Sequence, residues 1–380
     1  MMKLKSLPRK VLRGMPYLGK ELRAIVSDHT PLFIAVPRVV HIWRNGPCNA
    51  KCIMCEYGFL KAEQLRAHIK TRFPDEMMPR ALDQIAELCG RGTIVTYMSG
   101  EPMVVRAMTD WVEQCGRLGL DLRFTTNGYL LDEKMAERYV AAGMFNIGVS
   151  LESLDPKINE VIRPYPDGTA KTIRAIDSLI SERQRQKKYT SVNIKTMLCE
   201  LNLESFIDII LRYGKVDGVM VTPQIFENLV GMPDDVREKL RIRDTERLRR
   251  ILDRIRELKA EGYNVHVSDQ ALDEFLKVYT EDPLRKNTMR STNLEMDPSE
   301  PACNIGTDNM WIQEGYVKLC PQHPPIGDFV IDKLTLKEMW QSEMTRKIRA
   351  GTRACRRLCT ISCLRRTPLR HKVGTFLKIA

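Results

Sequence analysis

Between residues 39 and 262 the sequence alternates short apolar runs with longer segments of helical periodicity. Apolar positions that recur every three to four residues predict amphipathic helices, and short apolar runs rich in β-branched residues predict buried strands. The predicted strands are Val39–Arg44, Thr93–Met98, Leu122–Thr126, Phe145–Leu151, Val192–Leu198 and Gly218–Thr222, with a further short one at Val265–Ser268. The predicted helices are Ala81–Cys89, Met108–Leu118, Glu133–Ala142, Ala170–Arg185, Leu203–Tyr213 and Thr245–Gly262.

Strands that are separated by helices of this length form right-handed parallel units. Gly119, Gly143 and Gly214 each stand where a helix needs a left-handed end before the next strand, which supports the boundaries. Six successive units predict an α/β fold, an open or partial (β/α)6 barrel rather than a flat doubly wound sheet. In both architectures ligands bind at the carboxyl ends of the strands, so the chemistry is expected there.

The domain organisation follows from changes in composition. The segment 281–302 is polar, contains three prolines and lacks periodicity, so it is predicted to be a linker. We therefore expect a basic N-terminal extension at 1–34, the barrel at 35–280, the linker at 281–302, a small cysteine-rich α+β domain at 303–366 and a basic tail at 367–380.

Composition indicates the expected cellular compartment and shows how the charge is distributed. The longest apolar run, Leu32–Val36, is far shorter than the roughly 20 residues that span a bilayer, and no secretory signal precedes it, so a cytoplasmic protein is expected. Residues 1–44 and 346–380 carry net charges of +7 and +11, against +12 for the whole chain. Such ends are most simply solvated surface. An anionic membrane, an anionic substrate and nucleic acid are the alternatives, and nucleic acid is the least favoured.

The cysteines carry more information. There are eleven, an odd number without a secretion signal, which argues against a disulfide framework. Cys89, Cys115 and Cys199 stand alone in apolar segments and are expected to be small core residues. The other eight form two groups, and clustered thiolates in a reducing compartment favour a metal ion or an iron-sulfur cluster.

The first group follows the first strand directly and has the spacing Cys48-x3-Cys52-x2-Cys55. Three thiolates on one loop can hold three irons of a 4Fe-4S cluster and leave the fourth iron open for chemistry. A structural zinc ion wants four ligands, and neither His41 on the strand nor the distant His68 completes such a set.

These motifs resemble the radical S-adenosylmethionine (SAM) superfamily, whose hallmark is this cysteine loop after the first strand of a partial barrel. Ser99-Gly100-Glu101-Pro102 is similar to the family's Gly-Gly-Glu-Pro segment, which holds the methionyl amino group. The resemblance implies that SAM is also contacted, at its ribose and carboxylate, by polar residues after the next strands, Asn127, Ser150, Glu152 and Arg163. Two positions depart from the family pattern: Ser99 replaces a Gly, and Met54 stands where many relatives have an aromatic residue.

The second cysteine group resembles the SPASM or Twitch extensions of one branch of this superfamily. Ile312–Cys320, with a turn at Glu314-Gly315, is predicted to form a hairpin, and the segment 327–340 is predicted to lead into a helix. Five cysteines suffice for one auxiliary 4Fe-4S cluster. We favour Cys303, Cys320 and Cys359 as ligands, with Cys363 or Cys355 as the fourth. A C-terminal zinc knuckle is the alternative.

The resemblance implies the following activity. A reduced cluster on the loop cleaves SAM, and the resulting 5'-deoxyadenosyl radical abstracts a hydrogen atom from a substrate. The auxiliary cluster assists a net oxidation or bond formation, and a reductase such as flavodoxin or ferredoxin supplies electrons. The substrate is a small molecule, a peptide or a lipid-linked compound. The 38 residues before the first strand are too few for a peptide-recognition domain, which weakens the peptide hypothesis.

Three further residues are candidate substrate contacts or bases, namely Lys195, Gln224 and His266, because they lie near predicted strand ends. Two other classes of protein stay open on the sequence alone. One is an iron-sulfur electron carrier without chemistry, and the other is a zinc-containing nucleic-acid-binding protein.

Overall fold

The computed structural model describes residues 35–226, 231–281, 308–320 and 323–353. The expected N-terminal extension, the basic tail and almost all of the expected linker lie outside these ranges, as do Cys303, Cys355, Cys359 and Cys363. Within them no helix is both long enough and apolar enough to cross a membrane.

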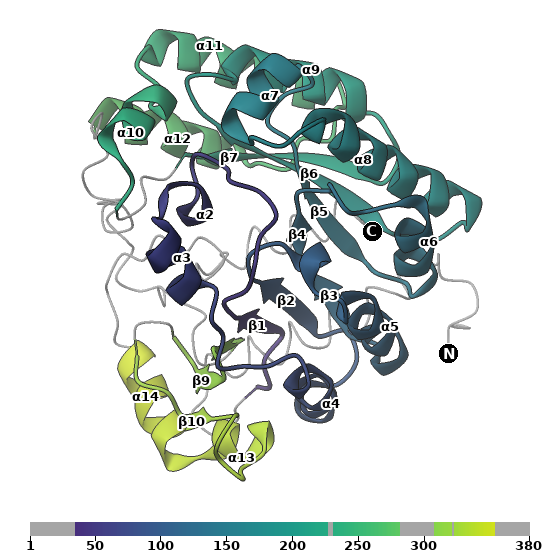
Figure 1. Ribbon diagram of the computed structural model, residues 1–380, viewed down its shortest axis with the longest axis vertical. Helices are drawn as coiled ribbons and strands as arrows, with labels where there is room; N and C mark the ends of the chain where they lie inside the picture. Colours follow the sequence, from purple (N-terminus) through teal and green to yellow (C-terminus); the bar gives the residue numbers. More distant parts are fainter. Residues whose placement is uncertain (1–34, 227–230, 282–307, 321–322, 354–380) are drawn as a thin grey trace, which may run out of the picture.

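Parallel strands form the centre of the molecule (Figure 1). They are β1 (Val39–Trp43), β2 (Ile94–Met98), β3 (Asp121–Arg123), β4 (Thr125–Thr126), β5 (Asn146–Ser150), β6 (Ser191–Leu198) and β7 (Val219–Ile225). The predicted strand Leu122–Thr126 is interrupted at Phe124, so β1, β2 and β3 belong to one sheet and β4 to β7 to a second. With β3 and β4 counted as one strand, the six predicted strand-helix units are present, and the α/β partial barrel is confirmed.

Helices cover the outer face of these sheets (Figure 1). The long ones are α4 (Met77–Cys89), α5 (Met108–Leu118), α6 (Glu133–Ala141), α8 (Gly168–Arg185), α9 (Leu203–Tyr213), α11 (Thr245–Ala260) and α12 (Asp269–Glu281). The short ones in the barrel are α2 (Glu56–Phe59), α3 (Ala62–His68), η2 (Pro102–Val104), α7 (Pro156–Ile162) and α10 (Asp234–Leu240). Alternate strand residues such as Val40, Ile42, Val192 and Ile194 are fully buried under them and form the core.

One predicted strand was wrong. Val265–Ser268 makes a single parallel bridge, between Val265 and Val221, and no strand forms there. The sequence pattern also missed α12, whose first residue follows this segment directly. β7, in contrast, continues three residues past its predicted end, through Pro223 to Ile225. Proline is tolerated there because, in the described part of the chain, β7 pairs with a strand on one side only.

The C-terminal segment continues the barrel sheet. β8 (Asn309–Gln313) pairs in parallel with β1, and it forms a hairpin with β9 (Tyr316–Lys318), which pairs in turn with β10 (Gly327–Asp328). The hairpin turns at Glu314 and Gly315, both with positive φ, as the predicted turn requires. α13 (Leu336–Gln341) and α14 (Glu343–Arg353) follow, and α13 contacts α4 beside the sheet (Figure 1).

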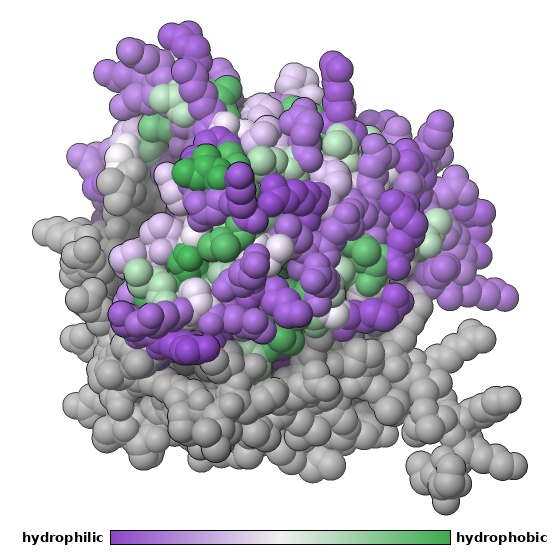
Figure 2. Space-filling model, turned by 90° about the horizontal axis from the view of Figure 1, so that it is seen from below, coloured by the Kyte–Doolittle hydropathy of each residue, from purple (hydrophilic) through white to green (hydrophobic). Residues whose placement is uncertain are grey.

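One face of the molecule is seen from below in Figure 2. Hydrophilic side chains dominate its described part, and the apolar groups between them are small and separated. Scattered apolar side chains of this kind are ordinary for a folded protein.

Candidate active site

The three cysteines of the first group lie on the loop between β1 and α2. The Cys55 amide donates to the Cys52 carbonyl (3.0 Å), which closes a turn and brings the three residues into one small cluster. Cys52 is buried, Cys48 and Cys55 are half-buried, and they pack with Ala50, Met54, Tyr129 and Tyr165. The predicted ligand set is therefore gathered at one place.

Backbone contacts fix this loop to the next strand. The Glu101 amide donates to the Pro47 carbonyl (2.9 Å), and a Cβ on Gly100 would lie only 2.3 Å from that same oxygen. The nearest neighbour of Gly100 is thus the protein's own cysteine loop, so the absence of a side chain at Gly100 is needed to seat the loop.

Glu101 joins the end of β2 to the end of β4. Its buried carboxylate accepts from the Thr126 hydroxyl (2.5 Å), the Asn127 amide (2.8 Å) and the Met103 amide (3.0 Å). Burial raises the pKa of Glu101, and the three donors partly oppose that shift. The carboxylate therefore holds two strand ends in fixed relation; its expected contact with SAM stays a prediction.

Asn127 carries this connection on to the cysteine loop. Its side-chain nitrogen donates to Asn49 Oδ1 (2.8 Å), and its side-chain oxygen accepts from the Tyr129 amide (2.9 Å). Ser150 ends β5 and is almost buried. Both residues lie at the carboxyl ends of the strands, where their roles as SAM contacts were predicted.

The buried Glu152 and the half-buried Arg163 form an ion pair beside the thiols. Arg163 Nε donates to Glu152 Oε1 (2.7 Å), and Arg163 Nη1 donates to the Cys52 sulfur (3.4 Å). The other Glu152 oxygen accepts from the Met197 amide (2.7 Å). Burial raises the pKa of Glu152, and Arg163 opposes the shift. The two predicted SAM contacts thus contact each other, and Arg163 also contacts a cysteine.

The thiols themselves are in a desolvated environment. Burial raises the pKa of Cys48 to about 12 and also raises that of Cys55, which the Arg163 charge partly opposes. Iron binds the thiolate form, so loading the loop with metal must release protons that burial otherwise retains.

The residues present fit an iron-sulfur cluster with bound SAM. Within the described ranges, no three Cys, His, Asp or Glu side chains are grouped closely enough to hold a single ion. The three thiols pack in one small cluster, and such neighbours suit a 4Fe-4S cluster because its thiolates bind separate irons. A buried polar atom beside the loop, Asn49 Nδ2, has no hydrogen-bond partner within the described residues and is free for a ligand.

Comparison with known proteins identifies this part of the chain. Residues 46–197, from the start of the cysteine loop through β6, match the family model of the Radical SAM superfamily. These residues form a radical SAM domain. The match covers the cysteine loop, Glu101, Asn127 and the Glu152–Arg163 pair.

Curated relatives share parts of this domain. The chain is 32% identical over 175 residues to a probable GTP 3',8-cyclase of Methanosarcina mazei, covering 44% of this chain and 49% of that protein. It is 30% identical over 129 residues to the PqqA peptide cyclase of Granulibacter bethesdensis, covering 34% of this chain and 32% of that protein. The chain thus spans about half, or less, of the length of the curated relatives it matches.

Solved structures share the fold over most of the chain. Streptococcus suis SuiB bound to its precursor peptide SuiA superposes with a TM-score of 0.57 at 16% identity, covering 89% of this chain and 70% of that one. The protein anSMEcpe with bound AdoMet and a Cp18Cys peptide gives 0.52 at 15% identity, covering 90% and 96%. Sequence identity this low shows the fold alone.

The three candidate substrate residues occupy different places in the radical SAM domain and beside it. Lys195 reaches across the inner face of the barrel to Thr125, where its Nζ donates to the hydroxyl (2.8 Å). Gln224 is exposed near the end of β7. His266 follows the bridge to β7, and its side chain is exposed in part. Partial burial, followed by the charges of Arg123 and Lys195, lowers its pKa.

The C-terminal ligand set is described for one cysteine. Cys320 is buried just after β9, where its side chain belongs to the main core cluster. The other four expected ligands lie outside the described residues, so the auxiliary cluster stays a prediction.

Several residues around the loop escaped the sequence analysis. Asn49 lies inside the cysteine motif, and its side-chain oxygen accepts a hydrogen bond from Asn127. The Tyr57 hydroxyl donates to the Gly46 carbonyl (2.6 Å). Tyr129 stacks on Tyr165 (4.1 Å between centroids) and packs against the thiols. The available signal was position: Asn49 separates the first two ligands, and Tyr129 directly follows the Asn127-Gly128 strand end.

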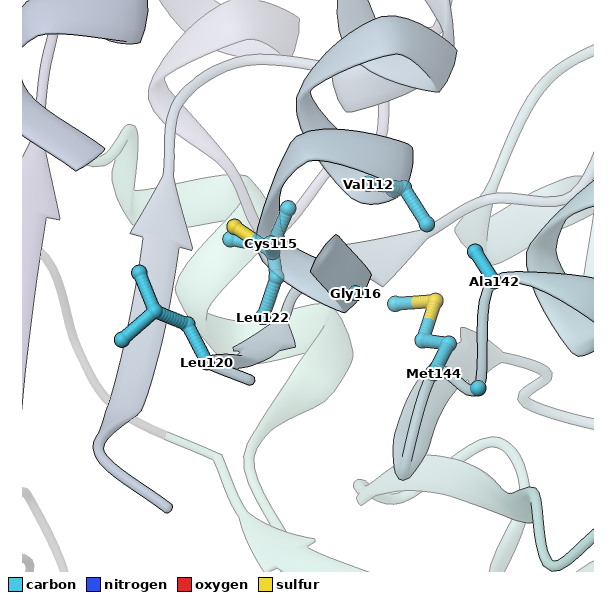
Figure 3. Close-up of a pocket in the computed structure, with 8 residues that line it drawn as sticks. Val112, Cys115, Gly116, Leu120, Leu122, Ala142 and Met144 are labelled. Carbon is cyan, nitrogen blue, oxygen red and sulfur yellow. The ribbon is translucent and has the colours of Figure 1, made fainter. Parts of the chain in front are cut away.

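A separate small pocket, drawn in Figure 3, lies on the outer side of the sheet. Apart from Cys115 and two glycines its lining is apolar, and the loop cysteines do not contribute to it. Cys115 is 1% exposed, and burial raises its pKa to about 12. It therefore remains a thiol, and the expectation that Cys89, Cys115 and Cys199 are core residues is confirmed. The residues lining the pocket are Val112, Cys115, Gly116, Leu120, Leu122, Ala142, Gly143 and Met144.

Proposed function

We propose that this chain is a radical SAM enzyme in which Cys48, Cys52 and Cys55 hold a 4Fe-4S cluster. The observation that carries the proposal is the attachment of the cysteine loop to the ends of β2 and β4 through Glu101, Asn127 and the Pro47 carbonyl. When bound, the cluster would supply the electron that cleaves SAM to methionine and a 5'-deoxyadenosyl radical. The radical would then abstract a hydrogen atom from the substrate.

The chain's own residues would prepare the site for this chemistry. Tyr129, Tyr165 and Met54 pack around the thiols and exclude water, which a reactive radical requires. Ser99 would offer its hydroxyl oxygen to the amino group of SAM, at the segment where the family holds that group. Arg163 would keep one donor on the Cys52 sulfur, and Asn49 would offer its unpartnered nitrogen.

We further propose an auxiliary 4Fe-4S cluster in the C-terminal region, as in SPASM or Twitch proteins. The predicted hairpin and the buried Cys320 behind it support this assignment. The cluster would accept an electron from the substrate radical, giving a net oxidation or a new bond. The expected electron donor is a reductase such as flavodoxin or ferredoxin.

Substrate screening should begin with peptides and nucleotides. Relatives named as a PqqA peptide cyclase and a mycofactocin maturase, and a neighbour solved with a precursor peptide, support a peptide. Relatives named as GTP 3',8-cyclases support a nucleotide. Lipid-linked substrates come next, because the basic residues before 35 would favour an anionic membrane.

The deciding experiment measures 5'-deoxyadenosine formed from SAM by the anaerobically reconstituted and reduced protein. We expect product from the parent and from Cys89→Ala, a cysteine outside the loop, and none from the Cys48→Ala/Cys52→Ala/Cys55→Ala variant. Iron without product, and without SAM binding in equilibrium dialysis, would instead indicate an electron carrier. Zinc in place of iron would indicate the nucleic-acid-binding alternative.

Iron analysis tests the auxiliary cluster separately. Two 4Fe-4S clusters correspond to about eight irons per chain, and the triple variant should retain about four. A parent with about four irons, or a triple variant with none, would contradict the second cluster.

A further inference from the structure

The inner face of β6 carries polar residues. Val192, Ile194 and Leu198 are buried in the core under the helices. Because successive strand residues point to opposite faces, Asn193 and Lys195 project into the barrel. The hydroxyl of Thr222 on β7 donates to the Asn193 side-chain oxygen (2.7 Å), which confirms that these two strands share this polar inner face.

Gly148 of β5 leaves the space through which the Lys195 side chain crosses the inner face of the barrel. Lys195 Nζ passes β5 to reach Thr125 on β4. A Cβ on Gly148 of β5 would lie 3.2 Å from Lys195 Cε and 2.7 Å from Thr125 Oγ1. The backbone of Gly148 is not in the left-handed region, so the glycine is needed here for space rather than for conformation.

No carboxylate of the described residues balances the charge of Lys195. Its described partner is a hydroxyl, and no ion pair joins Lys195 or His266 to a carboxylate within the described residues. Arg123, the third cation of this face, is paired with Asp121 (2.5 Å). Burial and the Arg123 charge lower the pKa of Lys195, so the charged form of this side chain is disfavoured where it lies. A desolvated ammonium without a counter-charge is costly, and an anion bound there would offset the cost.

Hydrogen-bond donors converge around this unbalanced charge. Because the Asn193 oxygen accepts from Thr222, its side-chain NH2 is the part that remains to donate. Lys195 of β6 pairs in register with Thr222 of β7. The His266 amide donates to the Val221 carbonyl of β7 (2.8 Å), so His266 lies beside β7, which in turn neighbours β6. The exposed side chain of His266 keeps this region open to solvent.

We propose that Lys195, Asn193 and His266 bind an anionic group of the substrate, a carboxylate or a phosphate, inside the barrel. The inference rests on the proposed function, because the anion is part of a substrate only if the chain is an enzyme. It deepens that function by naming a chemical group that the substrate must carry. A hydroxyl contact alone would make Lys195 a structural tie between β6 and β4, which is the competing explanation.

Isothermal titration calorimetry on the reconstituted full chain tests the site with potassium phosphate and potassium acetate, with potassium chloride to match ionic strength. We expect the parent to bind at least one of the two, and the stronger binder identifies phosphate or carboxylate as the preferred group. Lys195→Gln should weaken binding about tenfold or more, because a charged hydrogen bond is lost. Lys188→Gln, an exposed lysine shortly before β6, is the matched control and should bind like the parent.

Two further variants keep the test decisive if Lys195→Gln folds poorly. His266→Gln changes an exposed side chain and should weaken binding several-fold, and Gly148→Ala should weaken it by displacing the Lys195 stem. Absence of binding of both anions to the parent, or unchanged binding in Lys195→Gln, would overturn the inference. Anion binding requires neither SAM nor reduction. Binding without 5'-deoxyadenosine would therefore defeat the proposed function alone, and 5'-deoxyadenosine without binding would defeat this inference alone.

Discussion

Arg163 Nη1 lies 3.4 Å from the sulfur of Cys52 and donates a hydrogen bond to it. The same guanidinium is held by Glu152, which is completely buried two residues beyond β5. The position of a donor against a cluster ligand therefore depends on a carboxylate that has no access to water. Removing either member of the pair should affect both the fold and the cysteine loop.

Arg163→Gln should lower the free energy of unfolding of the metal-free protein by about 3–5 kcal/mol, because the Glu152 carboxylate is left buried and unpaired. The double variant Glu152→Gln/Arg163→Gln should recover part of the loss, since no charge is then buried. Urea unfolding followed by circular dichroism measures both. A double variant as unstable as the single one would contradict this account. Arg185→Gln, which removes an exposed ion pair with Glu182, is the control and should change stability little.

The same substitution should alter the loaded protein. A hydrogen bond to a cluster sulfur stabilises the reduced, more negative state, so Arg163→Gln should lower the reduction potential of the loop cluster. A redox titration followed by electron paramagnetic resonance measures the shift. An unchanged potential in a variant with full iron content would show that the Arg163 contact with Cys52 is not retained once the cluster is bound.

Gly100→Ala should displace the cysteine loop. The added Cβ would lie 2.3 Å from the Pro47 carbonyl and 2.7 Å from the Gly46 carbonyl, and backbone atoms cannot move aside without moving the loop. We expect anaerobic reconstitution to leave the loop cluster largely unformed, with about four irons fewer per chain than the parent.

Gly262→Ala is the matched control for this substitution. Gly262 has a positive φ and no atom within 4 Å of an added Cβ, so alanine introduces backbone strain without a clash. It should cost about 1 kcal/mol of stability and leave the iron content at the parent value. Equal iron contents in the two variants would show that the close approach at Gly100 does not determine how the loop is seated.

Local sequence pattern predicted most of the barrel because each unit has its own signal. Strands of β-branched residues and helices of regular periodicity agreed. Gly119 and Gly143 have the predicted left-handed conformation, whereas Gly214, with a φ of −66°, does not. Pattern failed where distant residues decide the structure. β8 pairs with β1 across some 270 positions of sequence, and nothing in the segment around Trp311 specifies that partner. β7 passes through Pro223 because it lies at a sheet edge, which sequence alone does not reveal.

At the site, too, the residues could be predicted from the sequence but their partners could not. Spacing singled out the three cysteines, and the resemblance to the radical SAM superfamily singled out Glu101, Asn127 and Arg163. The partners of these side chains could not be predicted, because Glu101 meets Thr126 and Asn127 only when β2 and β4 lie near each other in the folded barrel. The path of the Lys195 side chain likewise depends on the space left by Gly148, and the neighbours of this glycine in the sequence do not indicate that role.

Glu101→Gln should destabilise the strand ends although it preserves shape. Three donors point at the carboxylate, and the amide NH2 of glutamine would face at least one of them as a second donor. An unsatisfied buried donor costs about 1–3 kcal/mol, so the free energy of unfolding should fall by that amount. Urea unfolding of Glu101→Gln, Thr126→Val and the double variant tests whether the two side chains interact. If they do, the double variant should lose less free energy of unfolding than the sum of the two single losses. Additive losses would contradict a shared hydrogen-bond network.

His41 connects the C-terminal hairpin to the barrel. Its ring is 5% exposed, and its two nitrogens contact Thr96 of β2 (2.7 Å) and Asn309 of β8 (3.0 Å). The ring also stacks on Trp311 (4.2 Å between centroids). Burial lowers the pKa of His41 below its ordinary 6.5, and the contact with Asn309 only partly opposes the shift.

The protein should therefore lose stability as the pH falls below about 6.5, because the unfolded chain then takes up a proton at His41 that the folded protein does not. Above that pH the neutral ring is retained in both states, and the contribution is fully present. His41→Gln keeps a neutral, hydrogen-bonding side chain, so its stability should fall less than that of the parent between pH 7.5 and pH 5.5, whatever its stability at the higher pH. Melting temperatures of the metal-free proteins at the two pH values give the comparison. Equal decreases in parent and variant would show that His41 is not the group that couples the β1–β8 contact to pH.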